Sequence, residues 1–300
     1  MNLIDFLQAV YIPQHDLRKH TVYHLQAAVK AFERWRGEPV TLAELSDDRV
    51  AGWLTAMLDA GTPRATIKGY RGGIITLWRF AFERGDVAMP PRLVKKVKLS
   101  KRIPSAWTLD QFTKLIEAAR REPGDIGRHA AADWWVALLL VGYDTGARIT
   151  PIMNLATADI DLLERRVVFR AEHVKTGRDE TFAISEDTTA AVRTIYRPGR
   201  ELLFGDWRSD RSQMSWPALT KRYRRILHRA GLPAGRRDLF HRVRRTTATQ
   251  LAKTVGNVEA AQLLGHSSPV LTEAAYIDSS QIKRRTPADI LPRPGKDGVA

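Results

Sequence analysis

The sequence predicts a mainly α-helical protein with a small β-sheet in its second part (an α+β arrangement). Along most of the chain, apolar residues recur at spacings of three and four, which is the period of an amphipathic helix. Convincing strand patterns occur only between residues 158 and 184, and none occurs before residue 100. Hydrophobic residues make up 44% of the 300 residues, which is enough to build the cores of two domains of ordinary size.

The first 88 residues are expected to form a small helical domain. Helical periodicity covers residues 15–36, 46–60 and 62–84. The second of these helices is expected to begin near Ser46. The third is expected to have Thr62 as its N-cap and Pro63 as its first helical residue, since proline is favoured there.

Residues 89–106 are expected to be a linker, because Pro90 and Pro91 stop any helix. The segment 92–102 has six basic residues and no acidic one. Two interpretations remain open: a solvated connector, or a tether that lies along DNA phosphates. The second interpretation predicts DNA contacts from Lys95, Lys96, Lys98, Lys101 and Arg102.

A second domain is expected over residues 107–280, followed by a tail over 281–300. A capping box, Thr108 to Gln111, opens a helix that runs to about Arg121. A nearly all-apolar stretch, 130–141, predicts a buried helix that includes Trp134 and Trp135. Strands at 167–169 and 181–184 flank a polar turn at 175–179. Helices are expected again at 186–196, 215–230, 241–254, 257–264 and 269–277.

The chain is strongly basic, with 48 Lys and Arg against 33 Asp and Glu, a net charge of +15 and a pI near 10.3. This balance indicates a polyanionic partner, with nucleic acid first, an anionic membrane second and merely solubilising charge third. Between residues 221 and 245 there are ten basic residues and one acid. That density adds four candidate DNA contacts: Lys221, Arg222, Arg242 and Arg245.

The absence of cysteine excludes disulfides and thiolate metal sites and fits a reducing cytoplasm. No apolar run reaches the roughly 18 residues that a membrane-spanning helix needs. The N-terminus has no basic segment before its short apolar stretch, so a secretory signal is not expected. We expect a cytoplasmic protein without a membrane partner.

Four short segments carry residue types suited to breaking a phosphodiester: 146–149, 174–177, 241–245, and 264–268 followed by Tyr276. Such a reaction needs cations for the charge that develops on phosphate, an activated nucleophile, and an acid for the leaving oxygen. Arginine can bind phosphate bidentately, and His241 and Arg244 can share one helix face. A tyrosine can form a covalent phosphotyrosine, but its usual pKa near 10 requires nearby cations.

These motifs resemble the tyrosine recombinase (phage integrase) family over most of the chain. Thr145-Gly-Ala-Arg148 is similar to the family's T-G-x-R turn after an apolar helix, and Lys175 to its hairpin lysine. His241-Arg-Val-Arg244, followed by Thr246-Thr-Ala-Thr249, is similar to its H-x-x-R helix. Leu264-Gly-His266-Ser-Ser268 is similar to its L-G-H-S-S segment, and Tyr276 follows on the next helix.

The resemblance implies a helical core-binding domain and a catalytic domain that close around DNA like a clamp. It implies a site-specific recombinase that cleaves and rejoins DNA through a 3′-phosphotyrosyl intermediate and a Holliday junction, without metal, cofactor or ATP. Tyr276 would be the nucleophile, Arg148 and Arg244 would stabilise the transition state, and Lys175 would be the general acid. His241 would assist proton transfer, and His266 would hydrogen-bond the phosphate.

The resemblance also implies a homotetramer on two double-stranded DNA sites, with C-terminal segments exchanged between neighbours. Residues 278–300 are the candidates for that exchange.

The sequence departs from the family pattern at two places. Where the family usually has an acid three residues after the first arginine, this chain has Pro151; Thr150 could cap a helix that Pro151 begins. The spacing from His266 to Tyr276 is ten, one more than usual, and Pro269 could absorb the extra residue. Otherwise Tyr276 would be turned from the phosphate by about 100°.

Alternatives stay open at this point. The same chemistry occurs in type IB topoisomerases, and a catalytically inactive DNA-binding relative would keep the fold. Arg178 competes with Lys175 for the hairpin position, and Tyr196 and Tyr223 are the rivals of Tyr276. Trp134 and Trp135 are expected in the core rather than stacked on bases.

Overall fold

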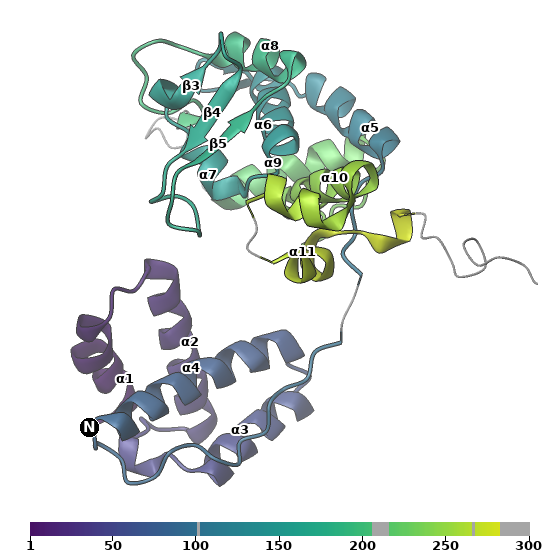
Figure 1. The fold of residues 1–300 in the computed structure, drawn as a ribbon. Helices are drawn as coiled ribbons and strands as arrows, with labels where there is room; N and C mark the ends of the chain where they lie inside the picture. Colours follow the sequence, from purple (N-terminus) through teal and green to yellow (C-terminus); the bar gives the residue numbers. More distant parts are fainter. Residues whose placement is uncertain (101–102, 206–215, 266–267, 283–300) are drawn as a thin grey trace, which may run out of the picture. The chain divides into compact units, whose positions relative to one another are not determined.

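The computed structural model describes residues 1–100, 103–205, 216–265 and 268–282. The chain divides into two compact units, residues 1–101 and 102–300 (Figure 1). The predicted fold class is confirmed: the chain is mainly helical, and its longer strands lie where the sequence pattern placed them.

The secondary structure of the N-terminal unit is helical and lies between residues 3 and 83 of its described part. It begins with α1 (Leu3–Phe6), which continues through a π-helical turn (Leu7–Tyr11) and a 3₁₀ turn (Ile12–Gln14). Three longer helices follow: α2 (Lys19–Arg36), α3 (Asp47–Asp59) and α4 (Arg64–Glu83). They enclose one core that includes the fully buried Phe32, Trp53 and Trp78. The predicted start of the third helix was wrong by one residue, because Pro63 and not Thr62 holds its N-cap position.

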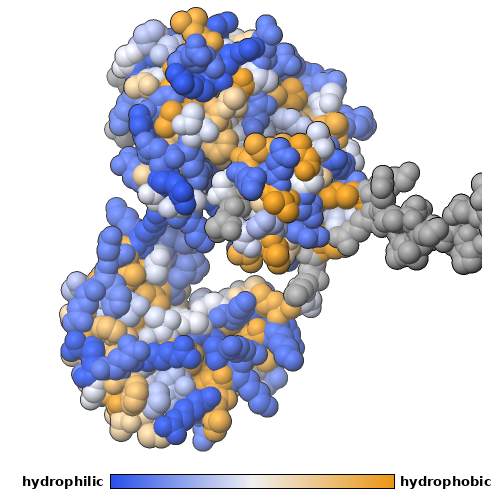
Figure 2. All heavy atoms as spheres, viewed as in Figure 1, coloured by the Kyte–Doolittle hydropathy of each residue, from blue (hydrophilic) through white to orange (hydrophobic). Residues whose placement is uncertain are grey.

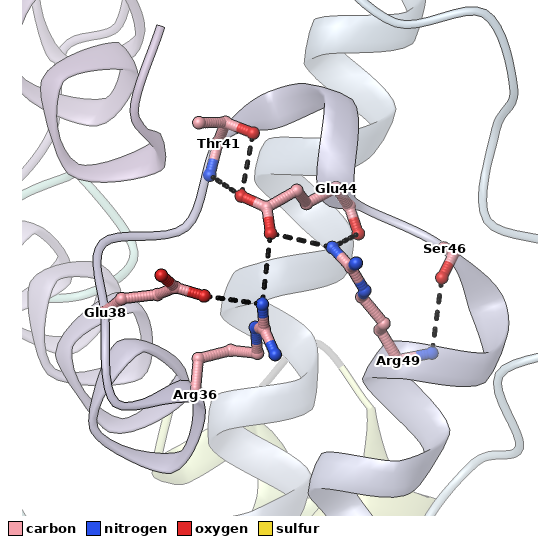
Figure 3. A network of polar contacts seen from close by, with 6 residues as sticks. All are labelled: Arg36, Glu38, Thr41, Glu44, Ser46 and Arg49. Carbon is pink, nitrogen blue, oxygen red and sulfur yellow. Dashed lines mark hydrogen bonds and ion pairs between the residues drawn. The ribbon is translucent and has the colours of Figure 1, made fainter.

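Glu44 organises the turn between α2 and α3 (Figure 3). Its carboxylate accepts hydrogen bonds from the Thr41 backbone N–H (2.9 Å), the Thr41 hydroxyl (2.8 Å) and the Arg49 guanidinium (2.8 Å). These bonds hold the pKa of Glu44 below its usual value. Ser46 caps α3 as predicted, because its hydroxyl oxygen accepts from the Arg49 N–H.

The first part of the predicted linker belongs to the N-terminal unit. Val94 is buried in the core of that unit. The Arg71 guanidinium donates to the carbonyls of Val94 (2.6 Å) and Lys95 (2.9 Å), and the Arg92 N–H donates to Asp47 (3.1 Å). The expected domain end at residue 88 therefore moves to about residue 101. The sequence pattern missed this because a single buried valine and backbone contacts leave no periodic signal.

The C-terminal unit contains a three-stranded antiparallel sheet and helices around a buried central helix. The sheet has the order β3-β4-β5, formed by β3 (Ile160–Asp161), β4 (Arg166–Phe169) and β5 (Glu180–Ala183), with Val167 opposite Phe182. The central helix α6 (Ala131–Thr145) packs against α5 (Leu109–Arg120), α8 (Glu186–Ile195) and α10 (Phe240–Leu263). A short hairpin, β1 (Asp125–Ile126) and β2 (His129–Ala130), precedes α6.

Several predictions for this unit are confirmed. Thr108 and Gln111 form the capping box that opens α5. Trp134 and Trp135 are fully buried, as expected of core residues. The two helices expected at 241–254 and 257–264 are α10, which is interrupted at Gly256, where φ is 84°. The remaining helices are α7 (Ile149–Met153), α9 (Trp216–Arg229) and α11 (Pro269–Tyr276).

Among the described helices, none is both long enough and apolar enough to cross a membrane. Hydrophobic side chains are exposed over α11 and the end of α10 (Figure 2). The most exposed are Val270 and Leu271 on α11, and Val258 and Leu263 on α10.

Candidate active site

Arg148 is positioned by the sharp end of α6. Gly146 ends that helix in the left-handed conformation, at φ 59°. A side chain there would be strained by the positive φ, and its Cβ would lie 2.4 Å from Leu264 Cδ2, which would have to move. Arg148 follows at the N-cap position of α7. The expected capping by Thr150 was wrong, since α7 begins at Ile149 and Thr150 lies inside it.

His241 and Arg244 lie one turn apart near the start of α10, as predicted. The Arg244 side chain is buried, and its guanidinium donates to the carbonyl of Gly146. A second link joins α10 to the end of α6, because the Thr247 hydroxyl donates to the Tyr143 carbonyl (2.7 Å). These bonds hold the two arginine-bearing segments against each other.

Tyr276 is the last residue of α11 and meets both arginines. The Arg148 guanidinium donates to the Tyr276 hydroxyl at 3.3 Å. The Arg244 guanidinium carbon lies 4.8 Å from the centre of the Tyr276 ring, and the His241 ring centre lies 5.2 Å from it. Four residues that are up to 128 positions apart in sequence thus share one site.

The long spacing before Tyr276 does not turn the side chain away. Pro269 is at the first position of α11, as predicted, and Ser268 caps the helix by accepting from the Leu271 N–H (3.3 Å). The contact between Arg148 and the Tyr276 hydroxyl shows that this arrangement directs the phenol towards the arginines.

Lys175 reaches the same site from the loop between β4 and β5. It lines a pocket of about 550 Å³ together with Arg148, Arg244 and Tyr276. Arg178 is not one of the described residues that line this pocket. The structure therefore favours Lys175 for the hairpin position. The base of the loop is closed by Asp179, which accepts from the Arg170 guanidinium (2.8 Å) and from the Ala171 N–H (2.8 Å).

The electrostatics of the site favour an ionisable phenol and a neutral imidazole. Burial raises the pKa of Tyr276, but the cations of Arg244 and Arg148 outweigh it and leave that pKa below its usual value. Desolvation, then Arg245, Arg244 and Arg148, lower the pKa of His241 to about 4. Its ring can therefore accept a proton at neutral pH.

Comparison with known proteins identifies this constellation. The model of the phage integrase family matches residues 106–282, which is more than half of the chain and contains all six predicted catalytic residues. The chain belongs to the phage integrase family. The predicted resemblance to tyrosine-type site-specific recombinases is thus confirmed.

Relatives by sequence carry the same assignment. The chain is 29% identical to the tyrosine recombinase XerD of Mycobacterium tuberculosis over an alignment of 273 positions that covers 84% of each protein. It is 25% identical to a putative tyrosine recombinase XerC of Pseudomonas aeruginosa over 293 residues, covering 90% of this chain and 67% of that protein.

The fold of this recombinase is also that of solved integrases. A lambda integrase dimer bound to a COC′ core site matches with a TM-score of 0.72 at 19% identity, covering 95% of this chain and 99% of that one. The integrase of the transposon Tn1549, in complex with circular intermediate DNA, matches with a TM-score of 0.68 at 15% identity, covering 96% and 97%.

The two rival tyrosines of the recombinase lie elsewhere. Tyr223 is fully buried and stacked on Phe240, with ring centres 4.5 Å apart, and burial raises its pKa. Tyr196 lines a different pocket, beside β3 and β4. The environment of Tyr223 therefore disfavours its ionised phenol, whereas the arginines lower the pKa of Tyr276.

Two predicted DNA contacts have structural roles inside the recombinase. The Arg222 guanidinium donates to buried Glu122 (2.8 Å) and to the carbonyls of Pro123 (2.6 Å) and Asp125 (3.2 Å). Arg242 is buried, stacks on the Trp107 ring at 3.4 Å and pairs with Asp238. Their donors are directed at the protein, so we withdraw both from the predicted DNA contacts.

The other predicted DNA-contacting residues are exposed or partly exposed, or lie outside the described residues. Lys95, Lys96, Lys98 and Lys221 are exposed, and Arg245 is partly exposed. His266, Lys101 and Arg102 lie outside the described residues.

Sequence reasoning missed Glu180, which lines the pocket with the cationic residues. Its carboxylate accepts from the hydroxyl of Thr176, the neighbour of Lys175, at 2.8 Å. Its charge also opposes the lowering of the Arg244 pKa that burial causes. The sequence did offer one signal for this residue. Glu180 is the first acidic residue of the strand that directly follows the loop with Lys175.

The pKa of His241 leads to a testable pH dependence. If neutral His241 accepts the phenol proton, activity is lost as pH falls through its pKa, near 4 and not near the usual 6.5. We expect the second-order rate constant of DNA cleavage, which reports the free enzyme, to show no loss centred at 6.5. Rates at subsaturating protein from pH 4.5 to 8 test this. A loss centred near 6.5 that disappears in His241→Gln would contradict it.

Proposed function

We propose that this recombinase cleaves one strand of a double-stranded DNA site by attack of the Tyr276 phenol on the scissile phosphate. The new bond joins the tyrosine oxygen to phosphorus, and the bond from phosphorus to the 5′ oxygen breaks. The product is a 3′-phosphotyrosyl enzyme and a free 5′-hydroxyl. The observation that carries this proposal is the 3.3 Å contact between the Arg148 guanidinium and the Tyr276 hydroxyl.

Each remaining residue has a role in this proposal. Arg148 and Arg244 stabilise the charge that develops on the phosphate oxygens, where two arginines can each offer paired donors. Lys175 gives a proton to the departing 5′ oxygen, and neutral His241 takes the proton of the phenol. His266 keeps its proposed hydrogen bond to the phosphate on the strength of the sequence motif.

Rejoining is the reverse step with a new strand. A 5′-hydroxyl from the partner duplex attacks the phosphotyrosine, so one phosphoester replaces another and no ATP, metal or cofactor is needed. Two such exchanges pass through a Holliday junction. A lambda integrase tetramer bound to a Holliday junction, with a TM-score of 0.70 at 20% identity, supports the proposal of a homotetramer on two sites. The cytoplasm is its proposed location.

DNA binding in this proposal uses basic residues of both units. Lys95, Lys96 and Lys98 on one unit and Lys221 and Arg245 on the other are the proposed phosphate contacts, with Lys101 and Arg102 added from the sequence.

A nicked suicide substrate tests the proposed function. The duplex is selected from a random-sequence library by binding to the protein, and a nick beside the cleavage position lets the short 5′-hydroxyl product diffuse away. We expect the wild-type protein to form an adduct with this duplex that survives SDS. Binding without any adduct would favour a catalytically inactive relative.

A second assay separates a recombinase from a type IB topoisomerase. We expect no relaxation of a supercoiled plasmid that lacks the selected site. Efficient relaxation of that plasmid by monomeric protein would contradict site-specific recombination.

A further inference from the structure

The segment after Tyr276 is anchored in its own catalytic unit. Ile277 and Asp278 are buried. The Asp278 N–H donates to the Thr249 hydroxyl oxygen on α10 (2.9 Å). Its carboxylate accepts from the Ser280 N–H (3.2 Å), the Ser280 hydroxyl (2.5 Å) and the Gln281 amide (3.1 Å). Residues 278–282 thus contact their own catalytic unit, whereas the rest of the segment predicted to be exchanged, residues 283–300, lies outside the described residues.

Asp278 also binds the start of the catalytic unit. Its carboxylate accepts the Ala106 N–H at 3.0 Å, from a residue 172 positions away in the sequence. The Ala106 carbonyl in turn accepts from the Gln281 amide (3.1 Å) and from Arg242 (3.3 Å). Ala106 lies at the end of the predicted linker, so the linker end and the segment after the nucleophile are joined directly.

The next residue strengthens this joint. The Trp107 N–H donates to the Thr246 hydroxyl oxygen on α10 (2.9 Å), and Arg242, the neighbour of His241, stacks on the Trp107 ring. The linker end is thus held both by α10 and by the residues after Tyr276.

The helix that carries Tyr276 packs on α10 through few buried side chains. Of the eight residues of α11, only Thr272 is buried, while Val270 and Leu271 are largely exposed. Tyr276 is its last residue, two positions before the buried Asp278. The anchored residues that follow Tyr276 therefore add to the contacts that place its phenol.

We infer that Asp278 is a positioning residue for Tyr276, which ties the nucleophile to the end of the linker between the two units. The inference rests on the proposed function, because it assigns Tyr276 as the nucleophile. It implies that the path of the linker into the catalytic unit affects where the phenol lies. Asp278 itself touches no reacting atom.

Asp278→Ala removes the acceptor of four hydrogen bonds and should displace Tyr276. Because a displacement of about 1 Å can cost about 100-fold in rate, we expect adduct formation at saturating protein to slow by about 30- to 100-fold. Affinity for the selected duplex should change less than about 3-fold, since the reacting and DNA-contacting groups remain. Asp278→Asn, which keeps one acceptor oxygen, should lie between the two.

Asp161→Ala is the matched control. Asp161 also accepts two backbone N–H groups, from Leu163 (3.0 Å) and Glu164 (2.8 Å), but in the turn that leads from β3. We expect its adduct rate to match the wild type. Thermal unfolding of each variant shows whether it is folded; if Asp278→Ala is not, Asp278→Asn and Thr249→Val test the same anchor.

A modified substrate separates positioning of the nucleophile from help to the acid. A sulfur in place of the bridging 5′ oxygen leaves without protonation, so it should rescue Lys175→Ala but not Asp278→Ala. Rescue of Asp278→Ala, or a wild-type rate in the folded variant, would overturn the inference while leaving the proposed function intact. Absence of an adduct with the wild type would instead overturn the proposed function.

Discussion

Tyr276→Phe should abolish the covalent adduct with DNA while leaving DNA binding nearly unchanged. Phenylalanine lacks the oxygen that would attack phosphorus. The proposal assigns no other group of the site as a nucleophile. We expect a loss of more than about 10⁴-fold in adduct formation on the suicide substrate, given the size of effects seen when a nucleophile is removed. We expect intact binding, because the hydroxyl interacts with the arginines of the site and its removal leaves the proposed DNA-contacting residues in place.

Tyr223→Phe is the control for this experiment. The Tyr223 ring is stacked on Trp135 and Phe240 in the core, and its burial raises the pKa of the phenol. Removing that hydroxyl should leave the adduct yield at the wild-type level. An adduct that persists in Tyr276→Phe and disappears in Tyr223→Phe would reverse the assignment.

Arg244→Ala should cause the second-largest loss. Its guanidinium lies 4.8 Å from the Tyr276 ring centre and lowers the pKa of the phenol, and it is proposed to bind the phosphate. Loss of one donor to a developing oxyanion costs about 10²- to 10³-fold, and loss of phenol activation adds to this. We expect at least that reduction in the single-turnover cleavage rate, with affinity for DNA reduced far less.

The pH dependence of Arg244→Ala adds a second readout. Without this cation the pKa of Tyr276 should rise, because burial still raises it and the largest opposing effect is lost. The variant should therefore gain rate more steeply than the wild type between pH 7 and 9.5. Arg245→Lys, which keeps the charge of the neighbouring residue, is the control and should retain the wild-type rate within a few fold.

Arg244→Lys tests whether charge alone is enough. Lysine offers a point charge and not a planar pair of donors, so most of the loss should remain. Full activity in Arg244→Lys would show that paired donation by the guanidinium is not needed.

The site residues could be predicted from sequence because they occur in short local motifs. Arg148 follows a helix end that requires glycine, and His241 and Arg244 share one turn of a helix. The structure brings these motifs to Tyr276 and to the pocket that Lys175 lines. Even the longer spacing before Tyr276 was resolved by a local feature, the proline at the start of α11.

The errors have a common physical cause, which is that charge and exposure were inferred without tertiary contacts. Arg222 is in a basic run, but buried Glu122 lies across from it just after the end of α5, about a hundred residues away in sequence. Val94 is in a segment with a linker composition, yet its side chain completes the N-terminal core. Asp278 was missed because its partner Ala106 is distant in sequence. Glu180 was missed because the pocket that it lines is formed by residues distant in sequence and by a loop.

The most direct test of the central claim is to locate the covalent bond in the wild-type protein. The SDS-resistant adduct would be digested with nuclease and protease, and the peptide that carries the nucleotide identified by tandem mass spectrometry. The account predicts a phosphodiester on the hydroxyl of Tyr276, joined to a 3′ end. A nucleotide on any other residue, or attachment through a 5′ phosphate, would contradict it.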